Sequence, residues 1–553
     1  MSIHAPGKYR PFEPIPMPRR QWPGNTITTA PVWCSVDLRD GNQALQTPMS
    51  VAAKMRMWEM LVAIGFREIE VGFPAASDTE AAFIRALIEQ HRIPEQVTIQ
   101  VLSTCRQEHI RRTFQVLKGA PRAVVHIYNP TSTLQREVVF GTDRDGVKGI
   151  AVRGARWVAE CAAEQPDTAW VYEYSPESFT GTEIDYAVEV VDAVMNVWQP
   201  TPRRKAIVNL PATVEMATPN VYADQIEYFC QAVGRREGLI VSVHPHNDRG
   251  TAVAAAELAM MAGAERVEGT LFGNGERTGN VDLVTLALNM HTQGMDCGLD
   301  FSNMAEVVAG FEACTGMAVG PRQPYAGELV FTAFSGSHQD AIRKGLAHVR
   351  AGGAWRVPYV PIDPADLGGG CDRLVRINSQ SGKGGAAHVL ETFCDLRLPR
   401  GLEVAFGRHI KAESDADGGE LSAGRVWELF TRKYVRVAPF QLVEVHGASG
   451  DADSGVTRLT GVMARAGESH PVTGSGNGPV SALVDAMADR FGIRAEVLDY
   501  TEQALGPGAG AQACAVVQLS VDGGPVVYGV GLHGSVLTAS LNAVVSAVNR
   551  GVG

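Results

Sequence analysis

The segment VSVHPHND, Val241 to Asp248, carries an H-x-H pair at the end of an apolar, β-branched run. In an extended strand, residues two apart point to the same face. His244 and His246 therefore point the same way, and two neutral imidazoles on one face are part of a plausible divalent-metal site. An isolated H-x-H pair is more often two surface histidines, so other segments must supply further ligands. The acidic segment Asp37-Leu38-Arg39-Asp40, far upstream, has the residue types required.

The bulk composition limits the class of protein. A chain of 553 residues is too long for one compact core, which predicts two or more domains. The formal net charge of −11 argues against nucleic acid as the main partner. Nine scattered cysteines without a C-x-x-C pair are typical of reduced thiols in a cytosol. The Pro-rich N-terminal segment is neither a signal peptide nor a membrane anchor, and no apolar run reaches the roughly 20 residues that span a bilayer, so we expect a cytoplasmic protein.

From Val32 onward, short β-branched runs alternate with helical patterns such as 54–65, 78–91 and 251–263. Eight strands alternating with helices over about 250 residues are typical of a (β/α)8 TIM barrel. A doubly wound open sheet is the alternative, disfavoured because no G-x-G-x-x-G turn follows the first strand. The expected strands are 32–38, 67–73, 97–103, 123–129, 170–175, 205–210, 239–245 and 266–272.

A barrel places its chemistry at the carboxyl ends of its strands, and polar residues gather there in this sequence. Asp40 with the two histidines leaves coordination positions open on a divalent ion, as catalytic sites do. Asn280 is a candidate for a further oxygen ligand, directly or through water, and Arg39 suits an oxygen that gains negative charge. The polar residues at strand ends are Arg39, Asp40, His126, Tyr128, Ser175, Glu177, Asn209, Thr213, His244, His246 and the loop GNGERTGN (273–280).

Beyond about residue 325 the pattern changes. We expect a helix at 334–346, a loop and helix at 378–393, and an acidic hinge at 411–422. Strands followed by a helix then occur twice, which predicts a small α+β module with an internal pseudo-repeat and a binding or regulatory role. The expected division is an extended N-terminal arm (1–30), a TIM-barrel catalytic domain (31–325), linker subdomains of helices and loops (326–430) and a C-terminal α+β regulatory domain (431–553).

Four motifs carry a resemblance to a known family: SVDLRDGNQAL (35–45), NLPATVEMATPN (209–220), VHPHNDRGTAVA (243–254) and FGNGERTGNVDLV (272–284). They resemble the 2-isopropylmalate synthase family, within the pyruvate-carboxylase-like aldolases that include homocitrate, citramalate and HMG-CoA enzymes. The resemblance covers nearly the whole chain, including RINSQSGKGG in the linker and a C-terminal module that looks like a leucine-sensing domain. Segments such as FPAASDTE and EYSPESFTGTE point to the longer type of this family.

The resemblance implies a reaction and a set of roles. Acetyl-CoA, 3-methyl-2-oxobutanoate and water give (2S)-2-isopropylmalate and CoA, the first committed step of leucine biosynthesis. The implied divalent metal, Mg²⁺, Mn²⁺ or Zn²⁺, is held by Asp40, His244 and His246, with Asn280 in or beside its shell. Arg39 stabilises the developing alkoxide, His338 acts as the base, and Glu177 lies near the thioester. The substrate-binding residues are Thr213 for the carboxylate and Leu102, His126, Tyr128 and Ser175 for the branched side chain. A homodimer is expected.

Two segments depart from the family pattern. Cys371 stands where the family often has a tyrosine, before RINSQ. In GAGAQACAVVQ (508–518), Gly510 replaces an acidic residue and Val516 a tyrosine, which makes leucine as feedback inhibitor less secure than catalysis. A paralogous homocitrate- or citramalate-like enzyme that takes another 2-oxo acid is therefore the second hypothesis. A non-catalytic amino-acid sensor and an acyl-CoA lyase are weaker ones, because the catalytic set is intact and a lyase would not be expected to carry a sensing module.

Overall fold

The computed structural model describes residues 8, 10–370, 383–417, 421–451, 455–506, 508 and 510–552. The chain forms two compact units by its internal contacts: Met1–Val330 with Pro364–Gly369, and Phe331–Asp363 with Gly370–Gly553. Among the described residues, no helix combines the length and the hydropathy that crossing a bilayer requires.

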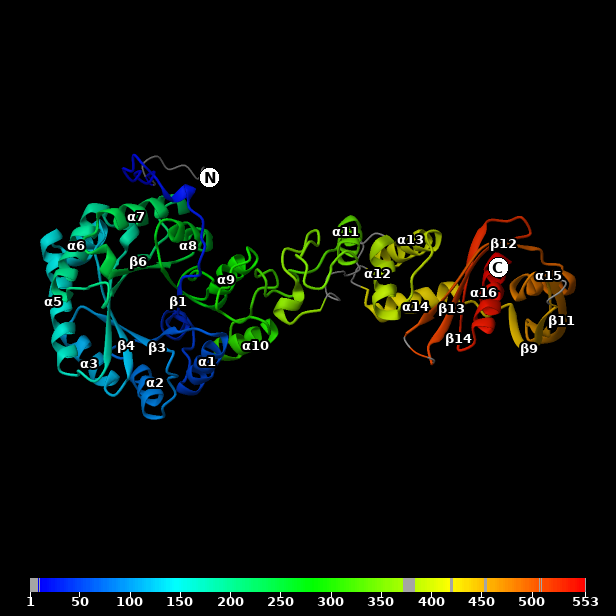
Figure 1. The fold of residues 1–553 in the computed structure, drawn as a ribbon, viewed down its shortest axis with the longest axis horizontal. Helices are drawn as coiled ribbons and strands as arrows, with labels where there is room; N and C mark the ends of the chain where they lie inside the picture. The colour runs from blue at the N-terminus through cyan, green and yellow to red at the C-terminus, as the bar shows by residue number, and fades with distance from the viewer. Residues whose placement is uncertain are drawn as a thin grey trace. The chain divides into compact units, whose positions relative to one another are not determined.

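The first unit is a closed barrel of eight parallel strands in the order β1 to β8, and β8 pairs back onto β1 (Figure 1). At the closure, Cys34 of β1 lies opposite Glu68 of β2 on one side and Glu268 of β8 on the other. The predicted (β/α)8 fold class is thus confirmed. The strands are β1 Val32–Ser35, β2 Glu68–Gly72, β3 Thr98–Thr104, β4 Arg122–Pro130, β5 Ala169–Glu177, β6 Ala206–Ala212, β7 Leu239–Pro245 and β8 Arg266–Gly269.

Helices cover the outside of the barrel and bury one apolar face against it. In α1, Ser50 caps the first turn by accepting from Ala53 N–H, and Gly65 ends the helix in the left-handed conformation, with a φ of 109°. Met57 and Leu61 of the same helix are fully buried. The helices are α1 Val51–Ile64, α2 Asp78–Glu89, α3 Gln107–Leu117, α4 Thr133–Gln135, α5 Arg144–Ala163, α6 Ile184–Trp198, α7 Pro219–Ala232, α8 Ala252–Met261, α9 Leu283–His291 and α10 Met304–Thr315.

The N-terminal arm is anchored on helix α7. Arg20 forms an ion pair with Asp224 at 2.7 Å, and the indole N–H of Trp22 donates to the same carboxylate at 2.9 Å. The backbone N–H groups of Gln21 and Trp22 donate to Glu227. Apart from the short turn η1 (Trp22–Gly24), the described part of the arm has no helix, as its proline content predicts.

The interior of the barrel contains a buried polar layer. Glu70, Gln100, Glu173, Arg266 and Glu268 come from four different strands, and each is completely shielded from solvent. Inward-facing side chains from alternate strands fill the interior of this fold in layers, and here one layer is charged rather than apolar. Because an isolated buried charge is costly, these groups must satisfy one another.

The second unit begins with helices and continues into two small sheets. Its helices α12, α13 and α14 share an apolar core with Cys514, Val516 and Val530 of the second sheet. The acidic hinge predicted at 411–422 is wrong for residues 411–417, which continue α13, because Lys, Ala and Glu are good helix formers. Its Gly418-Gly419 pair lies outside the described residues. The helices are α11 Gly336–Leu346, α12 Lys383–Cys394, α13 Arg400–Asp417 and α14 Ala423–Tyr434.

The C-terminal sheets form the predicted pseudo-repeat. Each is a three-stranded antiparallel sheet followed by one helix, and the two repeats bury a joint apolar core. The first repeat is β9 Phe440–Asp451, β10 Val456–Arg465, β11 Glu468–Gly476 and α15 Pro479–Phe491. The second is β12 Ala495–Leu505, β13 Gln512–Val521, β14 Val526–His533 and α16 Val536–Gly551.

Glycines in the third strand of each repeat allow the following helix to touch the strand backbone. A Cβ on Gly474 of β11 would lie 2.2 Å from the carbonyl oxygen of Ala482, eight residues later. A Cβ on Gly531 of β14 would lie 1.9 Å from the carbonyl oxygen of Ala539, also eight residues later. The same backbone contact therefore recurs at the same spacing, which supports an internal repeat.

Candidate active site

A cavity of about 500 Å³ opens at the carboxyl ends of the barrel strands. Its walls bring together residues from the ends of all eight strands and from the loops that follow them. Ten of the twelve predicted site residues line it: Arg39, Asp40, Leu102, His126, Tyr128, Ser175, Glu177, Thr213, His244 and His246.

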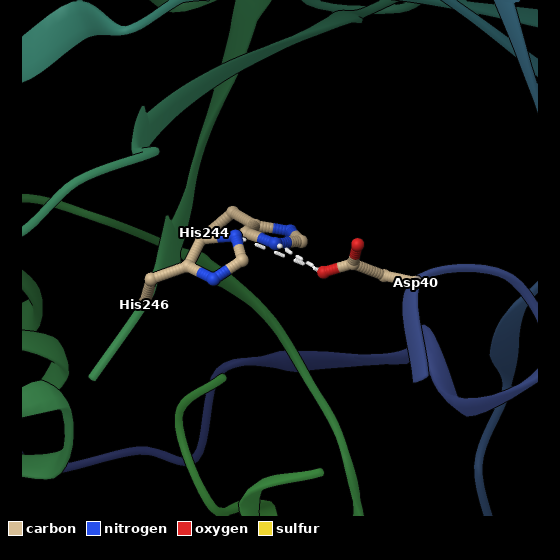
Figure 2. A group of neighbouring side chains, drawn as sticks. All are labelled: Asp40, His244 and His246. Atoms are coloured by element: carbon tan, nitrogen blue, oxygen red, sulfur yellow. Dashed lines mark hydrogen bonds and ion pairs between the residues drawn. The ribbon is translucent and has the colours of Figure 1, made fainter. Parts of the chain in front are cut away.

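The predicted metal ligands face one another across this cavity. Asp40 lies on the π-helical turn η2 (Asp37–Gly41) that follows β1, and His244 lies within β7, two residues before His246. The Oδ2 atom of Asp40 is 3.2 Å from Nε2 of His244 and 3.8 Å from Nε2 of His246. Figure 2 shows the carboxylate and the two imidazoles turned toward one another, and their possible ligand atoms all lie within 4.8 Å. This spacing allows one ion to contact all three.

Two unused polar atoms beside the cluster support a cation there. Asn280 is paired with His246 through a β-bridge and is 1% exposed. Its Nδ2 donates to the carbonyl of Asn274 at 3.1 Å, whereas its Oδ1 is buried without a hydrogen-bond partner among the described residues. Nδ1 of His246 is unpartnered in the same way. Since buried polar atoms are normally satisfied, the residues present fit a divalent metal.

The electrostatics of the cluster favour the metal-binding forms of Asp40 and His246. Burial acts to raise the pKa of Asp40, but Arg39 and the two histidines outweigh it and hold that pKa well below its usual range. Burial, and then the charge of His244, lower the pKa of His246 to about 4, so this imidazole is neutral at pH 7. An ionised carboxylate and a neutral imidazole are the forms that bind metal.

Arg39 lies beside the cluster and is fixed by two carboxylates. Its Nη1 donates to Asp40 at 3.1 Å and its Nε donates to the fully buried Glu70. The guanidinium also lines the cavity. A fixed cation at this position can stabilise an oxygen that becomes negative during reaction.

Glu177 and Thr213 lie on neighbouring parts of the cavity wall. Burial raises the pKa of Glu177, and the charge of Arg39 only partly opposes it. The hydroxyl oxygen of Thr213 accepts a hydrogen bond from the backbone N–H of Ser178 at 2.9 Å. Its hydroxyl proton therefore remains able to donate to a bound molecule.

The remaining predicted substrate residues form one wall across β3, β4 and β5. Leu102 is opposite His126 in the strand register, and Tyr128 is opposite Ser175. Nε2 of His126 is 2.7 Å from the Ser175 hydroxyl, and its Nδ1 is 3.1 Å from Glu70. Burial raises the pKa of Tyr128. The wall is thus a mixed polar and apolar surface.

His338 belongs to the second compact unit. It lies on α11 and is exposed, and its imidazole stacks on Tyr359 with ring centroids 4.0 Å apart and planes at 21°. Cys371 lies outside the described residues. Their roles therefore stay predictions.

The structure reveals two supporting groups that the sequence patterns did not single out. Lys54 of α1 is fully buried, donates to the carbonyl of Leu38 at 2.5 Å and forms an ion pair with Glu80 at 2.6 Å. It thus ties the turn that carries Arg39 to the first helix. Glu268 of β8 accepts from Nδ1 of His244 at 2.8 Å. The sequence offered no distinct signal for either residue, since α1 also contains Arg56 and Glu59 and β8 also contains Arg266.

The barrel, the linker and the C-terminal module each match a known family. Residues 30–309 match the family described as HMGL-like. Residues 328–391 match the alpha-isopropylmalate synthase post-catalytic domain-like family, and residues 420–552 match the LeuA allosteric (dimerisation) domain.

Full-length relatives carry one name. The 2-isopropylmalate synthase of Rhodospirillum rubrum is 53% identical and covers 100% of this chain and 99% of its own length. That of Ralstonia nicotianae is 54% identical, covering 100% of this chain and 96% of its own. That of Parafrankia sp. is 54% identical, covering 98% and 97%.

The closed barrel, with its acidic and imidazole ligands at the strand ends, defines an HMGL-like enzyme that uses a divalent metal. The linker and C-terminal matches, together with the full-length identities, narrow this class further. The chain belongs to the 2-isopropylmalate synthase family.

Proposed function

We propose that this chain condenses acetyl-CoA with 3-methyl-2-oxobutanoate and water to give 2-isopropylmalate and CoA, in leucine biosynthesis. The observation that carries the proposal is the cluster of Asp40, His244 and His246, which lines a cavity of about 500 Å³. Beside it lies Asn280, whose buried oxygen has no partner among the described residues. Full-length identity of 53% to proteins named for this reaction supports it.

The chain's residues have the following roles in the proposed reaction. Asp40, His244, His246 and Asn280 hold Mg²⁺, Mn²⁺ or Zn²⁺, and the bound cation supplies Lewis acidity toward the keto acid. Thr213 donates its hydroxyl to the substrate carboxylate. The branched chain lies against Leu102, His126, Tyr128 and Ser175.

Carbon–carbon bond formation requires a base and a charge stabiliser. His338 removes a proton from the acetyl methyl group, since a neutral imidazole nitrogen can accept a proton as a general base. The resulting carbanion attacks the keto carbon, and Arg39 stabilises the oxygen that becomes negative. Glu177, whose pKa is raised by burial, lies near the thioester, which water then hydrolyses to release CoA.

The wider setting is also proposed. The chain is divided into an arm (1–30), a catalytic barrel (31–325), linker subdomains (326–430) and a regulatory domain (431–553), and it acts in the cytoplasm as a homodimer. The LeuA match supports dimerisation. Leucine is the proposed feedback inhibitor, bound by the C-terminal module despite Gly510 and Val516. Val516 is 2% exposed and packs toward α12–α14, so it contributes to a core rather than to an open surface.

The test is CoA release from acetyl-CoA across a panel of 2-oxo acids, with and without leucine. We expect 3-methyl-2-oxobutanoate to give the highest kcat/KM, and His246→Ala to abolish release. A clear preference for another 2-oxo acid would favour a homocitrate- or citramalate-like enzyme. Absence of release with every acid, together with leucine binding, would favour a non-catalytic sensor.

A further inference from the structure

Two carboxylates of the buried layer, Glu268 and Glu173, have very different surroundings. Glu268 comes from β8 and Glu173 from β5, and both are completely shielded from solvent. Arg266 lies between them, 2.9 Å from Glu268 and 3.4 Å from Glu173. They therefore share one cation and one degree of burial, and they differ in their other partners.

Glu268 accepts four hydrogen bonds. Its Oε1 accepts from Gln100 Nε2 at 2.7 Å and from Arg266 Nη1 at 2.9 Å. Its Oε2 accepts from Asn209 Nδ2 at 3.1 Å and is 2.8 Å from His244 Nδ1. Only an ionised carboxylate accepts on both oxygens from this many donors, so the side chain is charged and its orientation is fixed.

This arrangement determines which nitrogen His244 offers to the cavity. A carboxylate that only accepts requires a proton on Nδ1 of His244. In the neutral ring the lone pair is then on Nε2, the atom 3.2 Å from Oδ2 of Asp40. Carboxylates behind histidine ligands fix the ring and make it more basic, and their loss commonly weakens metal binding 10- to 100-fold.

Glu173 has no comparable contact with a ligand. Its Oε1 is 3.4 Å from Arg266 and 3.8 Å from Nδ1 of His126, and its Oε2 has no partner among the described residues. Burial raises the pKa of Glu173 well above its usual range, more than the charge of Arg266 lowers it. Burial thus disfavours a charge on Glu173, and glutamine is a neutral replacement of the same shape.

We propose that Glu268 is a positioning residue that holds His244 with Nε2 directed at the metal, and that Glu173 has no part in this. The inference rests on the metal site of the proposed function and goes beyond it in assigning a role to a residue that touches neither metal nor substrate.

The test is titration of Mn²⁺ into metal-free full-length protein, followed by calorimetry, for wild type, Glu268→Gln and Glu173→Gln. We expect Glu268→Gln to weaken Mn²⁺ binding 10- to 100-fold. If its amide NH2 faces His244, it donates to Nδ1 and forces the other tautomer; if it faces the other way, it lies against Gln100 Nε2 and Arg266 Nη1, which are donors themselves. We expect the Mn²⁺ affinity of Glu173→Gln to stay within about threefold of wild type, since glutamine is neutral, has the same shape and leaves the contact between Glu268 and His244 in place.

A second readout and a second variant separate positioning from general damage. The visible absorption of Co²⁺-loaded protein reports the ligand field, and we expect it to change in Glu268→Gln and not in Glu173→Gln. Glu268→Asp keeps the charge and shortens the reach to His244. It is used if Glu268→Gln fails to fold, and we expect it to bind Mn²⁺ more weakly than wild type as well.

The outcomes distinguish this inference from the proposed function. Wild-type Mn²⁺ affinity in the folded glutamine variant, or in Glu268→Asp, would overturn the inference and leave the function standing. Equal losses in Glu268→Gln and Glu173→Gln would overturn it as well, since they indicate a general effect of the layer. Weaker Mn²⁺ binding in Glu268→Gln but not in Glu173→Gln would support the inference. If the wild-type protein at the same time released no CoA, the proposed function would be wrong while the inference still held.

Discussion

Three charged residues within four positions, Asp37, Arg39 and Asp40, lie on one π-helical turn and have separate roles. Arg39 and Asp40 face the cavity. Asp37 turns away from it and accepts from the Ser35 hydroxyl at 2.8 Å and from the backbone N–H of Leu271 at 3.1 Å. Asp37 thus joins the turn after β1 to the turn after β8.

The titration of Asp37 makes stability depend on pH. Burial raises its pKa to about 7, despite the hydrogen bonds that lower it, whereas the unfolded residue titrates near 3.9. Between about pH 4 and 7 the folded chain holds a proton that the unfolded chain lacks, so rising pH destabilises the fold. Asparagine cannot ionise, so we expect Asp37→Asn to reduce the decrease in unfolding free energy between pH 5 and pH 8. Urea unfolding at the two pH values measures this decrease. An unchanged pH dependence would contradict the assignment. Asp167→Asn, on the surface, is the control.

His338 supplies a second prediction at this scale. In the proposed reaction it is the base, a role that would contribute to proton transfer and not to metal binding. We expect His338→Ala to lower kcat by about 10²- to 10⁴-fold, the usual contribution of general-base catalysis, with Mn²⁺ affinity unchanged. His348→Ala is the matched control, because His348 is also exposed and follows the same helix. Equal rates for wild type and His338→Ala would remove this residue as the base.

At the scale of elements, supporting contacts locate the reactive groups. Helix α1 places Lys54 under the Asp37–Gly41 turn, and strand β8 places Glu268 behind His244 of β7. The carboxyl-end clustering of Asp40, His244 and Asn280 was predictable, since parallel strands bring their ends together and these residue types suit a metal. The supporting roles of Lys54 and Glu268 were not predictable. Their partners depend on which strands and helices become neighbours when the barrel closes, and the periodicity of the sequence does not contain that information. The hinge at 411–422 failed for a related reason, since its charged residues favour a helix as well as a loop.

The glycine in strand β14 gives an element-scale prediction. A methyl group on Gly531 would clash with backbone atoms of α16, which cannot rotate away as a side chain does. We expect Gly531→Ala to destabilise the C-terminal unit by about 1–3 kcal/mol or more. Chemical unfolding followed by circular dichroism measures this loss. Gly534→Ala is the control, because nothing lies within 4 Å of its added Cβ. Equal stabilities of the two variants would contradict the close contact.

At the scale of the whole molecule, the division into two compact units predicts separable unfolding. A metal that binds only the barrel stabilises only the barrel. At about 100 times its Kd, Mn²⁺ should add about 2.7 kcal/mol to the barrel's unfolding free energy. Differential scanning calorimetry should show one transition moving to higher temperature while the other stays in place. Both transitions moving together would indicate one cooperative unit, and Gly531→Ala identifies the C-terminal transition.

The paired glycines, Gly474 and Gly531, also bear on the history of the C-terminal module. After a gene duplication, the two copies can diverge in sequence wherever one side chain packs against another, because a substitution at one position can be compensated by a substitution at its neighbour. Where a strand backbone touches a helix backbone, no side chain is available to exchange, and both copies keep glycine opposite an alanine eight residues later. A contact of this kind tolerates little change, which accounts for the same glycine and alanine at the same spacing in both halves.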